Sequence, residues 1–238
     1  MFARRGPAAW PVPAIGPDGS PASPTCHAGG VPARRLVLAS ASPARLALLR
    51  AAGLEPEVMV SGVAEDDVAG LAAGEATRTL AERKAAAIAR RLRGATLPGQ
   101  PSPLVVGCDS LLAIDGEVRG KPDSADQARA WWRAQRGRSG VLTTGQAVVD
   151  LATGRRTSGI ADTVVHFGCP SDAEVEAYIA TGEPLAVAGA CTIEGYGAPF
   201  VTGIDGNHGT VIGLSLPLLR TLLADLGIAI TALWARHA

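Results

Sequence analysis

The sequence predicts an α/β fold built on one mixed β-sheet. Short apolar runs typical of strands alternate with longer segments in which apolar residues recur at helical spacing. Two neighbouring runs, residues 139–150 and 157–168, are separated by little more than a turn at 152–154, so they are expected to pair antiparallel. The elements do not repeat as strict βαβ units, and this favours a mixed sheet over a purely parallel one.

The elements are expected in a regular order from Arg35 onward. Strands are predicted over residues 36–40, 55–62, 104–114, 139–150 and 157–168. Helices are predicted over residues 42–53, 74–94, 125–137, 171–183 and 217–228. Residues 198–216 predict a strand, a loop and a short return. Capping residues support two of the helices: Ser42 with Pro43 at one start and Gly53 at its end, and Ser171 at the start of another.

The bulk composition limits the function classes. Lys and Arg total 22, as do Asp and Glu, so no overall charge draws the chain to nucleic acid or to an acidic membrane. Aromatic residues make up only 4%, which argues against a stacking platform for single-stranded nucleic acid. The four cysteines are scattered, and no apolar run reaches the roughly 18 residues that span a membrane. A protein of the reducing cytoplasm, with neither nucleic acid nor a membrane as partner, is expected.

Residues 1–34 differ in composition from residues 35–238, which form the expected folded domain. The segment is rich in proline and glycine and shows no apolar periodicity, as in a disordered leader. Arg4 and Arg5 resemble the start of a secretion signal, but Pro7 and the prolines after it interrupt the apolar run that a signal needs. An alternative is that translation starts at Val31, which an intact mass of the native protein would decide.

Asp109 stands in the middle of the apolar strand 104–114. A buried carboxylate is costly unless it is paired, bound to a metal or open to a cleft. A turn at Asp115 and Gly116 would bring the chain back antiparallel, so Gly120 and Lys121 are expected near Cys108 and Asp109. An aspartate and a lysine facing one cleft suit metal-assisted attack on a phosphate, and the structural alternative is a simple salt bridge.

Three further groups could complete such a site. Ser40, Ser42 and Arg45 surround a helix start, where free N–H groups favour an anion, although an ordinary capped helix explains them equally. Lys84 lies on the apolar stripe of its helix, where its ammonium must reach water or an anion. Glu65, followed by Asp66 and Asp67, could supply an oxygen ligand to a hard cation, or could be plain solvated loop.

Other motifs argue against other chemistries. The segment around His208 misses the spacing of a dinucleotide-binding loop, so His208 is expected to be a loop residue. The sequence has no GxSxG, HExxH or P-loop motif.

Six motifs in order resemble those of the Maf family of nucleoside triphosphate pyrophosphatases, over about residues 36–227. They are "LASASPARLALL", "VSGVAE", "ERKAAAIA", "GCDSLLAIDGEVRGKP", "YIATGEPLAVAGACTIEG" and "VIGLSLPLL". The resemblance implies a two-lobed α/β fold with an elongated mixed sheet, as in inosine triphosphate pyrophosphatases, and a nucleotide cleft between the lobes. It also implies Mg²⁺-dependent hydrolysis at the α-phosphorus, releasing a monophosphate and pyrophosphate.

The resemblance also implies roles for the candidate residues. The phosphate loop matches Ser40, Ser42 and Arg45, and the helix lysine matches Lys84. The remaining matches are the acidic residue Glu65, the catalytic aspartate Asp109 and the Gly-Lys-Pro lysine Lys121. Glu65 and Asp109 would hold the metal ion.

The chain departs from the family pattern at positions linked to base selection. Ala44 replaces an arginine, Ser110 follows Asp109 where many members have threonine, and Glu194 replaces a glutamine. These departures argue against a simple pyrimidine preference. Glu194 could accept hydrogen bonds from the N–H groups of a base, which would favour a guanine-like or modified base. Val187 and Ser215 also depart from the usual lysine and proline.

The sequence therefore favours a hydrolase that removes noncanonical or surplus nucleotides. The alternatives are a nucleotide-binding regulator of cell division and a structural nucleotide-binding module. Catalysis is favoured because binding alone needs no water-activating carboxylate. A homodimer is an expectation from the family resemblance alone.

Overall fold

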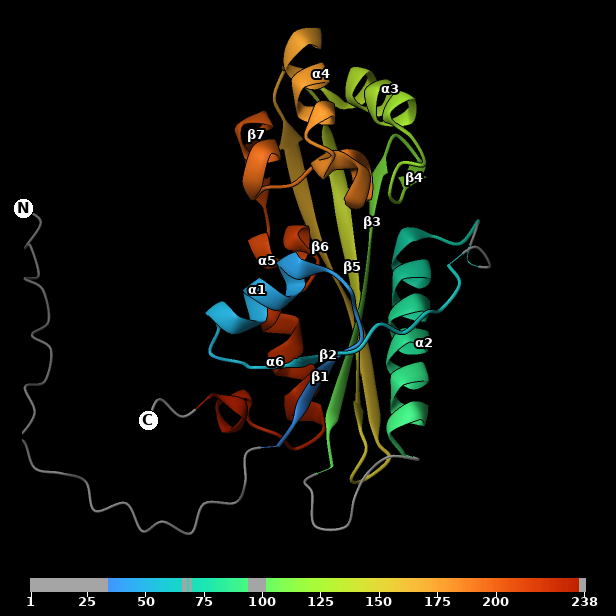
Figure 1. Ribbon diagram of the computed structural model, residues 1–238, viewed down its shortest axis with the longest axis vertical. Coiled ribbons are helices and arrows are strands. Elements are labelled where there is room, and N and C mark those ends of the chain that lie inside the picture. The colour runs from blue at the N-terminus through green and yellow to red at the C-terminus, as the bar shows by residue number, and fades with distance from the viewer. Residues whose placement is uncertain (1–33, 66–67, 69, 94–101, 236–238) are drawn as a thin grey trace, which may run out of the picture. The chain divides into compact units, whose positions relative to one another are not determined.

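The fold is organised around one seven-stranded mixed sheet, shown in Figure 1. The computed structural model describes residues 34–65, 68, 70–93 and 102–235. The sheet order is β2-β1-β3-β5-β6-β7, with β4 paired to β3. Strands β1 and β2 run parallel to each other, and β1 also runs parallel to β3, whereas all the remaining pairs are antiparallel. The predicted mixed sheet is therefore confirmed.

The strands differ greatly in length. Their bounds are β1 Leu36–Leu38, β2 Glu57–Val58, β3 Leu104–Ile114, β4 Glu117–Arg119, β5 Ser139–Asp150, β6 Arg156–Phe167 and β7 Val201–Asp205. The long strands β3, β5 and β6 pair over most of their length, so they form the backbone of the sheet. The strand predicted over 55–62 is much shorter than expected, because β2 pairs β1 through only two residues.

The helices begin where the sequence predicted them. Their bounds are α1 Pro43–Ala51, α2 Ala73–Arg93, α3 Ala125–Gln135, α4 Asp172–Ala180, α5 His208–Ile212 and α6 Leu216–Asp225. Ser42 caps α1 by accepting the N–H of Arg45, and Ser171 caps α4 in a capping box with Glu174. The short return predicted before residue 216 is wrong: this segment forms α5, and His208 is its first residue rather than a loop residue.

Helix α2 covers one face of the sheet, against β3, β5 and β6 (Figure 1). Close approach depends on two glycines: a Cβ on Gly107 would lie 2.2 Å from the Ala81 carbonyl oxygen, and one on Gly145 would lie 2.3 Å from the Thr77 carbonyl carbon. Side chains from α2, β1, β3 and β5 form the core of this face, including Val37, Ile88 and Val105.

The opposite face of the sheet carries two separate cores. Leu104, Val106 and Cys108 of β3 pack in one core with α1 and α6, and Leu112 and Ile114 of the same strand pack in another with α3 and α4. Ser110 lies between them along β3, as Thr144 and Gln146 do between Leu142 and Val148 of β5. The two cores thus meet across a row of polar side chains, Ser110, Thr144 and Gln146, which we call the polar row.

Two predictions concern the limits of the folded part. Residues 1–33 lie outside the described residues, whereas Arg34, assigned to the leader from the sequence, forms an ion pair with Asp150. No helix within the described ranges is long and apolar enough to span a membrane.

Candidate active site

The site is centred on a break in the pairing of one edge of β3. Strand β1 pairs this edge at residues 104–106, and β4 pairs it at residues 112–114. Between them, residues 107–111 have no strand partner on this edge within the part of the chain that the structure describes. The other edge of β3 stays paired with β5 throughout, so the strand is held rigid while its free edge can face a ligand.

Asp109 and Ser110 point to opposite faces of the sheet at this break. Neighbouring residues of a strand alternate between faces, and the contacts agree with that rule. Asp109 binds Lys84 of α2, whereas the hydroxyl of Ser110 binds Arg45 of α1. The site therefore has an acidic part on the α2 side and a polar part on the α1 side.

Lys84 joins the two candidate carboxylates. Its Nζ lies 2.6 Å from Oδ1 of Asp109 and 2.5 Å from Oε1 of Glu65. The side chains of Lys84 and Asp109 are 10% and 9% exposed, whereas that of Glu65 is 52% exposed. Of the two environments expected for the Lys84 ammonium, water or an anion, it meets two carboxylates, and the carboxylate of Asp109 is paired as its burial requires.

The pKa values of the two carboxylates are shifted in opposite directions. Burial raises the pKa of Asp109 above its usual value, although the charge and hydrogen bond of Lys84 partly offset this effect. Burial also opposes ionisation of Glu65, but Lys84, with smaller contributions from Lys121 and Arg45, holds its pKa below the usual value. Asp109 is therefore the better proton acceptor of the two, and Glu65 the more firmly ionised.

On the α1 side, the guanidinium of Arg45 joins several segments. Its Nη1 donates to Oγ of Ser40 at 3.1 Å and to the carbonyl of Cys108 at 3.0 Å. Its Nε donates to the carbonyl of Gly213 at 2.7 Å, and its Nη2 donates to Oγ of Ser110 at 3.1 Å. All four acceptors are uncharged, so these contacts leave the positive charge of Arg45 without neutralisation. This favours a nearby anion.

Lys121 follows the hairpin, two residues after β4 ends. Because Leu112 pairs Arg119 and Ile114 pairs Glu117, the same register continued would place Lys121 opposite Ser110, rather than beside Cys108 and Asp109 as predicted. Lys121 is exposed, and its charge is felt by Glu65. Lys121 thus follows the hairpin at about this register and lies within electrostatic range of Glu65.

The positions linked to base selection are less closely joined. Ser110 lies in the break beside Arg45, and Ala44 precedes Arg45 in α1. Glu194 is exposed and lies near Glu183, which contributes with burial to raising the pKa of Glu194. No contact that the structure describes joins Glu194 to Lys84, Asp109 or Glu65.

Ser215 caps α6, and its N–H donates to the side chain of Gln146 at 2.8 Å, which explains the serine there. Nothing in the structure explains Val187.

The sequence reasoning missed two threonines, one in the polar row and one that contacts it. Thr144 is fully buried and bonds both Ser110 and the carbonyl of Thr210. Thr210 is also buried and belongs to α5. The available signal was the polar stretch from Thr143 to Gln146 inside an otherwise apolar strand.

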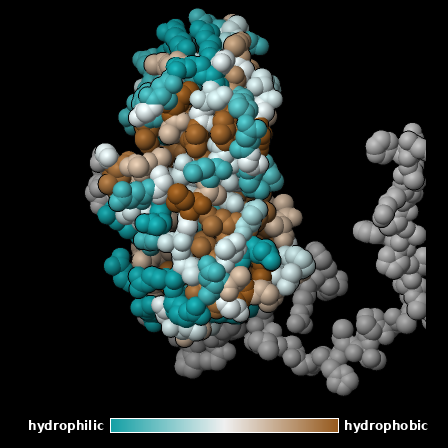
Figure 2. Space-filling model, turned by 180° about the vertical axis from the view of Figure 1, so that it is seen from behind, coloured by the Kyte–Doolittle hydropathy of each residue, from teal (hydrophilic) through white to brown (hydrophobic). Residues whose placement is uncertain are grey.

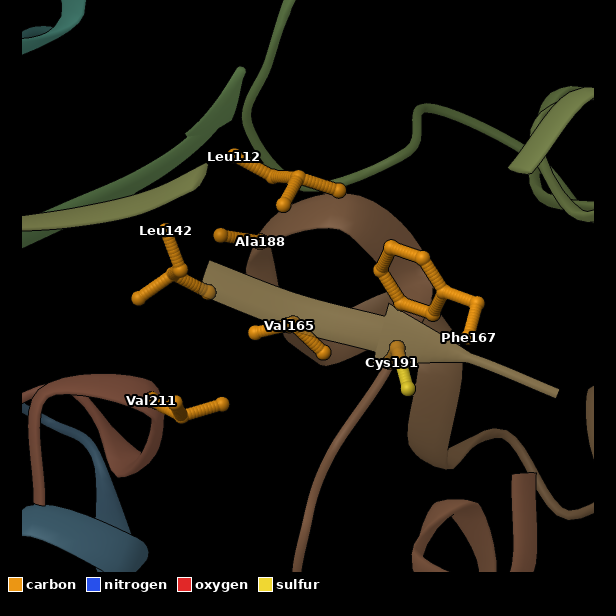
Figure 3. A pocket seen from close by; sticks show the side chains of 7 residues that line it. All are labelled: Leu112, Leu142, Val165, Phe167, Ala188, Cys191 and Val211. Atoms are coloured by element: carbon orange, nitrogen blue, oxygen red, sulfur yellow. The ribbon is translucent and has the colours of Figure 1, made fainter. Parts of the chain in front are cut away.

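An apolar pocket adjoins this polar row (Figure 3). Leu112, Leu142, Val165 and Val211 are among its lining residues, and their side chains surround a common space. Leu112 pairs Leu142 across β3 and β5, and Ser110 pairs Thr144 two residues away on the same face. No charged group lines the pocket, so the phosphates of a ligand would belong in the break instead.

The donor atoms fit a hard divalent cation. Mg²⁺ is usually held by one or two carboxylates together with substrate phosphate oxygens, and Glu65 and Asp109 provide two carboxylates on either side of Lys84. Within the described ranges no group of three or more His, Cys, Asp or Glu side chains could hold a metal by itself. Two carboxylates, Glu65 and Asp109, match a cation whose other ligands come from a substrate.

Several known proteins with similar sequences carry the same name. The family model described as Maf-like protein matches residues 35–226. A nucleoside triphosphate pyrophosphatase of Streptomyces coelicolor is 58% identical over 86% of this chain and 96% of its own length. Relatives of the same name are 57% identical in Salinispora tropica, covering 85% of this chain and 88% of theirs, and 47% identical in Mycobacterium ulcerans, covering 85% and 98%.

Proposed function

The chain belongs to the Maf family, and on that basis we propose that it is a nucleoside triphosphate pyrophosphatase. Its reaction is hydrolysis of a nucleoside triphosphate at the α-phosphorus, giving the monophosphate and pyrophosphate. The observation that carries this proposal is the contact of Lys84 with both Asp109 and Glu65, at the break in the β3 edge. A buried acid, a second acid and a lysine beside an open strand edge are suited to attack on a phosphoanhydride.

Asp109 is the residue best suited to act as the base. Its carboxylate is buried and its pKa is raised, so it accepts a proton more readily than an ordinary aspartate. In this role Asp109 orients the attacking water and takes its proton. Lys84 holds the carboxylate in place at 2.6 Å, and its charge partly offsets the rise in the pKa of Asp109 that burial causes.

The cations suit binding of the triphosphate. We expect Lys121, from the segment after β4, to join Lys84 of α2 and Arg45 of α1 at the break. Ser40 and Ser42 lie before and at the start of α1, where N–H groups favour a phosphate. These groups would bind the phosphates and stabilise the negative charge of the leaving pyrophosphate.

Glu65 and Asp109 are the residues that would hold Mg²⁺. When bound, the ion supplies positive charge to the phosphates and makes a coordinated water more acidic. Lys84 is then needed to keep two neighbouring carboxylates ionised before the ion arrives, since like charges oppose each other's ionisation.

The biological role that fits this chemistry is removal of noncanonical or surplus nucleotides in the cytoplasm. Ala44, Ser110 and Glu194 are the positions where base preference is expected to be set. A regulator of septum formation would need nucleotide binding but no base such as Asp109, and nothing observed favours it. Whether the protein is a homodimer can be tested by light scattering coupled to size exclusion.

The test is a panel of nucleoside triphosphates with Mg²⁺, followed by release of pyrophosphate. We expect hydrolysis of at least one nucleotide, and a loss of at least a hundredfold in kcat for Asp109→Asn, the lower range of general-base contributions. Exposed Asp225→Asn, at the end of α6, is the matched control and should keep full activity. Absence of pyrophosphate with every nucleotide would refute the function, and full activity of Asp109→Asn would refute the role of that residue.

A further inference from the structure

A chain of hydrogen bonds runs from Arg45 through the polar row to α5. Nη2 of Arg45 donates to Oγ of Ser110 at 3.1 Å. Oγ of Ser110 lies 2.8 Å from Oγ1 of Thr144, and Oγ1 of Thr144 donates to the carbonyl of Thr210 at 2.8 Å. The cross-strand pairing of Ser110 with Thr144 brings the two hydroxyls together on one face of the sheet.

The positions of the hydroxyl hydrogens follow from this chain. A carbonyl oxygen can only accept, so the single hydrogen of the Thr144 hydroxyl points to Thr210. The contact between Thr144 and Ser110 then needs the hydrogen of Ser110. Arg45 can only donate, which agrees with this direction. Ser110 therefore donates its only hydroxyl hydrogen to Oγ1 of Thr144, inside the protein.

Ser110 is left with acceptor capacity alone. A hydroxyl oxygen can accept two hydrogen bonds, and Arg45 supplies one of them. Thr144 is fully buried, whereas Ser110 is partly exposed at the break, so a ligand can reach Ser110 but not Thr144. We propose that Thr144 fixes Ser110 as a hydrogen-bond acceptor, so that the bound nucleotide meets Ser110 with an N–H or O–H group.

This inference rests on the proposed function and specifies how the same site selects its substrate. Thr144 acts through Ser110, so it is a positioning residue. The donor on the nucleotide has two sources: an amino or ring N–H group of the base, or a hydroxyl of the sugar. A carbonyl oxygen of the base at the same place would face the lone pairs of Ser110 and would be disfavoured.

The experiment compares substrates whose hydrogen-bond donors differ. Cytosine and adenine carry an amino donor where uracil and hypoxanthine carry a carbonyl, and uracil and hypoxanthine carry a ring N–H where cytosine and adenine carry an acceptor. The base arm compares cytidine with uridine triphosphate and adenosine with inosine triphosphate, and the sugar arm compares ribonucleotides with their 2′- and 3′-deoxy forms. In each arm we would measure kcat/KM from pyrophosphate release, and Kd by calorimetry with Ca²⁺ in place of Mg²⁺. The ratio within a pair removes any general loss of activity.

Thr144→Val removes the acceptor for the Ser110 hydrogen and frees that hydrogen to turn toward a ligand. We expect the preference for the donor-bearing nucleotide to fall about fivefold in one of the arms, the effect of one neutral hydrogen bond. Thr144→Ser keeps the hydroxyl and should restore the wild-type ratio. The matched control is Thr143→Val, whose hydroxyl bonds Asp162 on the other face of the sheet and whose ratios should not change.

Should Thr144→Val fail to fold, Ser110→Ala and Thr144→Ser decide the question, since the first must lose the preference and the second must keep it. A change confined to the base arm identifies a base N–H, and one confined to the sugar arm identifies a sugar hydroxyl; both support the proposal. Ratios in Ser110→Ala within twofold of wild type in both arms would overturn it. If no nucleotide were hydrolysed, the proposed function would fail while the Kd ratios still tested Ser110.

Discussion

Lys84 contacts two carboxylates at once, and its ammonium influences the pKa of both. Asp109 is buried enough for its pKa to rise in spite of this contact, whereas the half-exposed Glu65 has its pKa lowered. Because their pKa values are shifted in opposite directions, Asp109 is the better proton acceptor and Glu65 stays ionised more readily.

The pH dependence of the rate should reflect Asp109. A base must be deprotonated to act, so activity falls as pH drops through the pKa of Asp109, which lies above that of an ordinary aspartate. Lys84→Met removes the charge and the hydrogen bond that lower this pKa. We therefore expect the acid limb of the kcat/KM profile to move to higher pH in that variant.

The control for this profile is Arg90→Met, because Arg90 is an exposed cation on the same helix. Its acid limb should coincide with that of the wild type. An acid limb that stayed in place, or moved to lower pH, in Lys84→Met would show that Asp109 is not the group that titrates.

At this scale the sequence was informative for some residues and not for others. A lysine in an apolar helix stripe and an aspartate in an apolar strand both needed a partner, and each partners the other. Thr144 could not be found in this way, because its role depends on the register between β3 and β5 and on the carbonyl of Thr210 in α5. The polar stretch from Thr143 to Gln146 marks the place, but neither the strand register nor the position of that carbonyl can be seen in the local sequence.

At the level of secondary structure, Lys84 is held in position by the contact between α2 and the sheet. The helix lies against β3 and β5 at Gly107 and Gly145, where any side chain would overlap the backbone of α2. The nitrogen of Ala85 is also within 2.8 Å of a Cβ placed on Gly107. The distance between helix and sheet, and hence the contact of Lys84 with Asp109, depends on these two residues.

Gly107→Ala and Gly145→Ala should each destabilise the protein by about 3 kcal/mol, since overpacking a rigid core typically costs 1–3 kcal/mol or more. Urea unfolding followed by circular dichroism measures this cost. Gly203→Ala in β7 is the matched control, because its Cβ would lie 3.6 Å from His166 in ordinary contact. Equal stability of all three variants would mean that α2 does not pack as closely as described.

Element prediction succeeded where capping and periodicity agreed, as at Ser42 and Ser171. It was wrong for the return before residue 216, where α5 replaces a strand. That segment contains glycines, which disfavour a helix, and β-branched residues, which favour a strand. Its helix is held by two contacts that are distant in sequence, from Arg45 to Gly213 and from Thr144 to Thr210. Tertiary contacts therefore decided its conformation.

The molecule as a whole meets a highly charged substrate without a net charge of its own. Figure 2 shows hydrophilic and apolar residues intermixed over one face. Under the proposed function, binding of a triphosphate would depend on local groups, namely Lys84, Lys121 and Arg45. These come from α2, from the segment after β4 and from α1, so a bound nucleotide would join elements on both faces of the sheet.

A non-hydrolysable nucleoside triphosphate analogue with Mg²⁺ should therefore raise the unfolding temperature of the whole domain in one transition. At a hundred times Kd the stabilisation is about 2.7 kcal/mol. Calorimetry measures it, and chelation of the metal should reduce it because Glu65 and Asp109 then face the phosphates as bare negative charges. An equal shift with and without metal would contradict the assignment of these two residues as its ligands.

In the proposed reaction, water attacks the α-phosphorus at the break in the β3 edge. Hydrolysis of the preferred nucleotide in water labelled with ¹⁸O, followed by mass spectrometry of both products, tests it directly. We predict that the label enters the nucleoside monophosphate, that pyrophosphate carries none, and that Asp109→Asn abolishes the incorporation. Label in pyrophosphate, or release of orthophosphate and a nucleoside diphosphate, would contradict the proposed reaction.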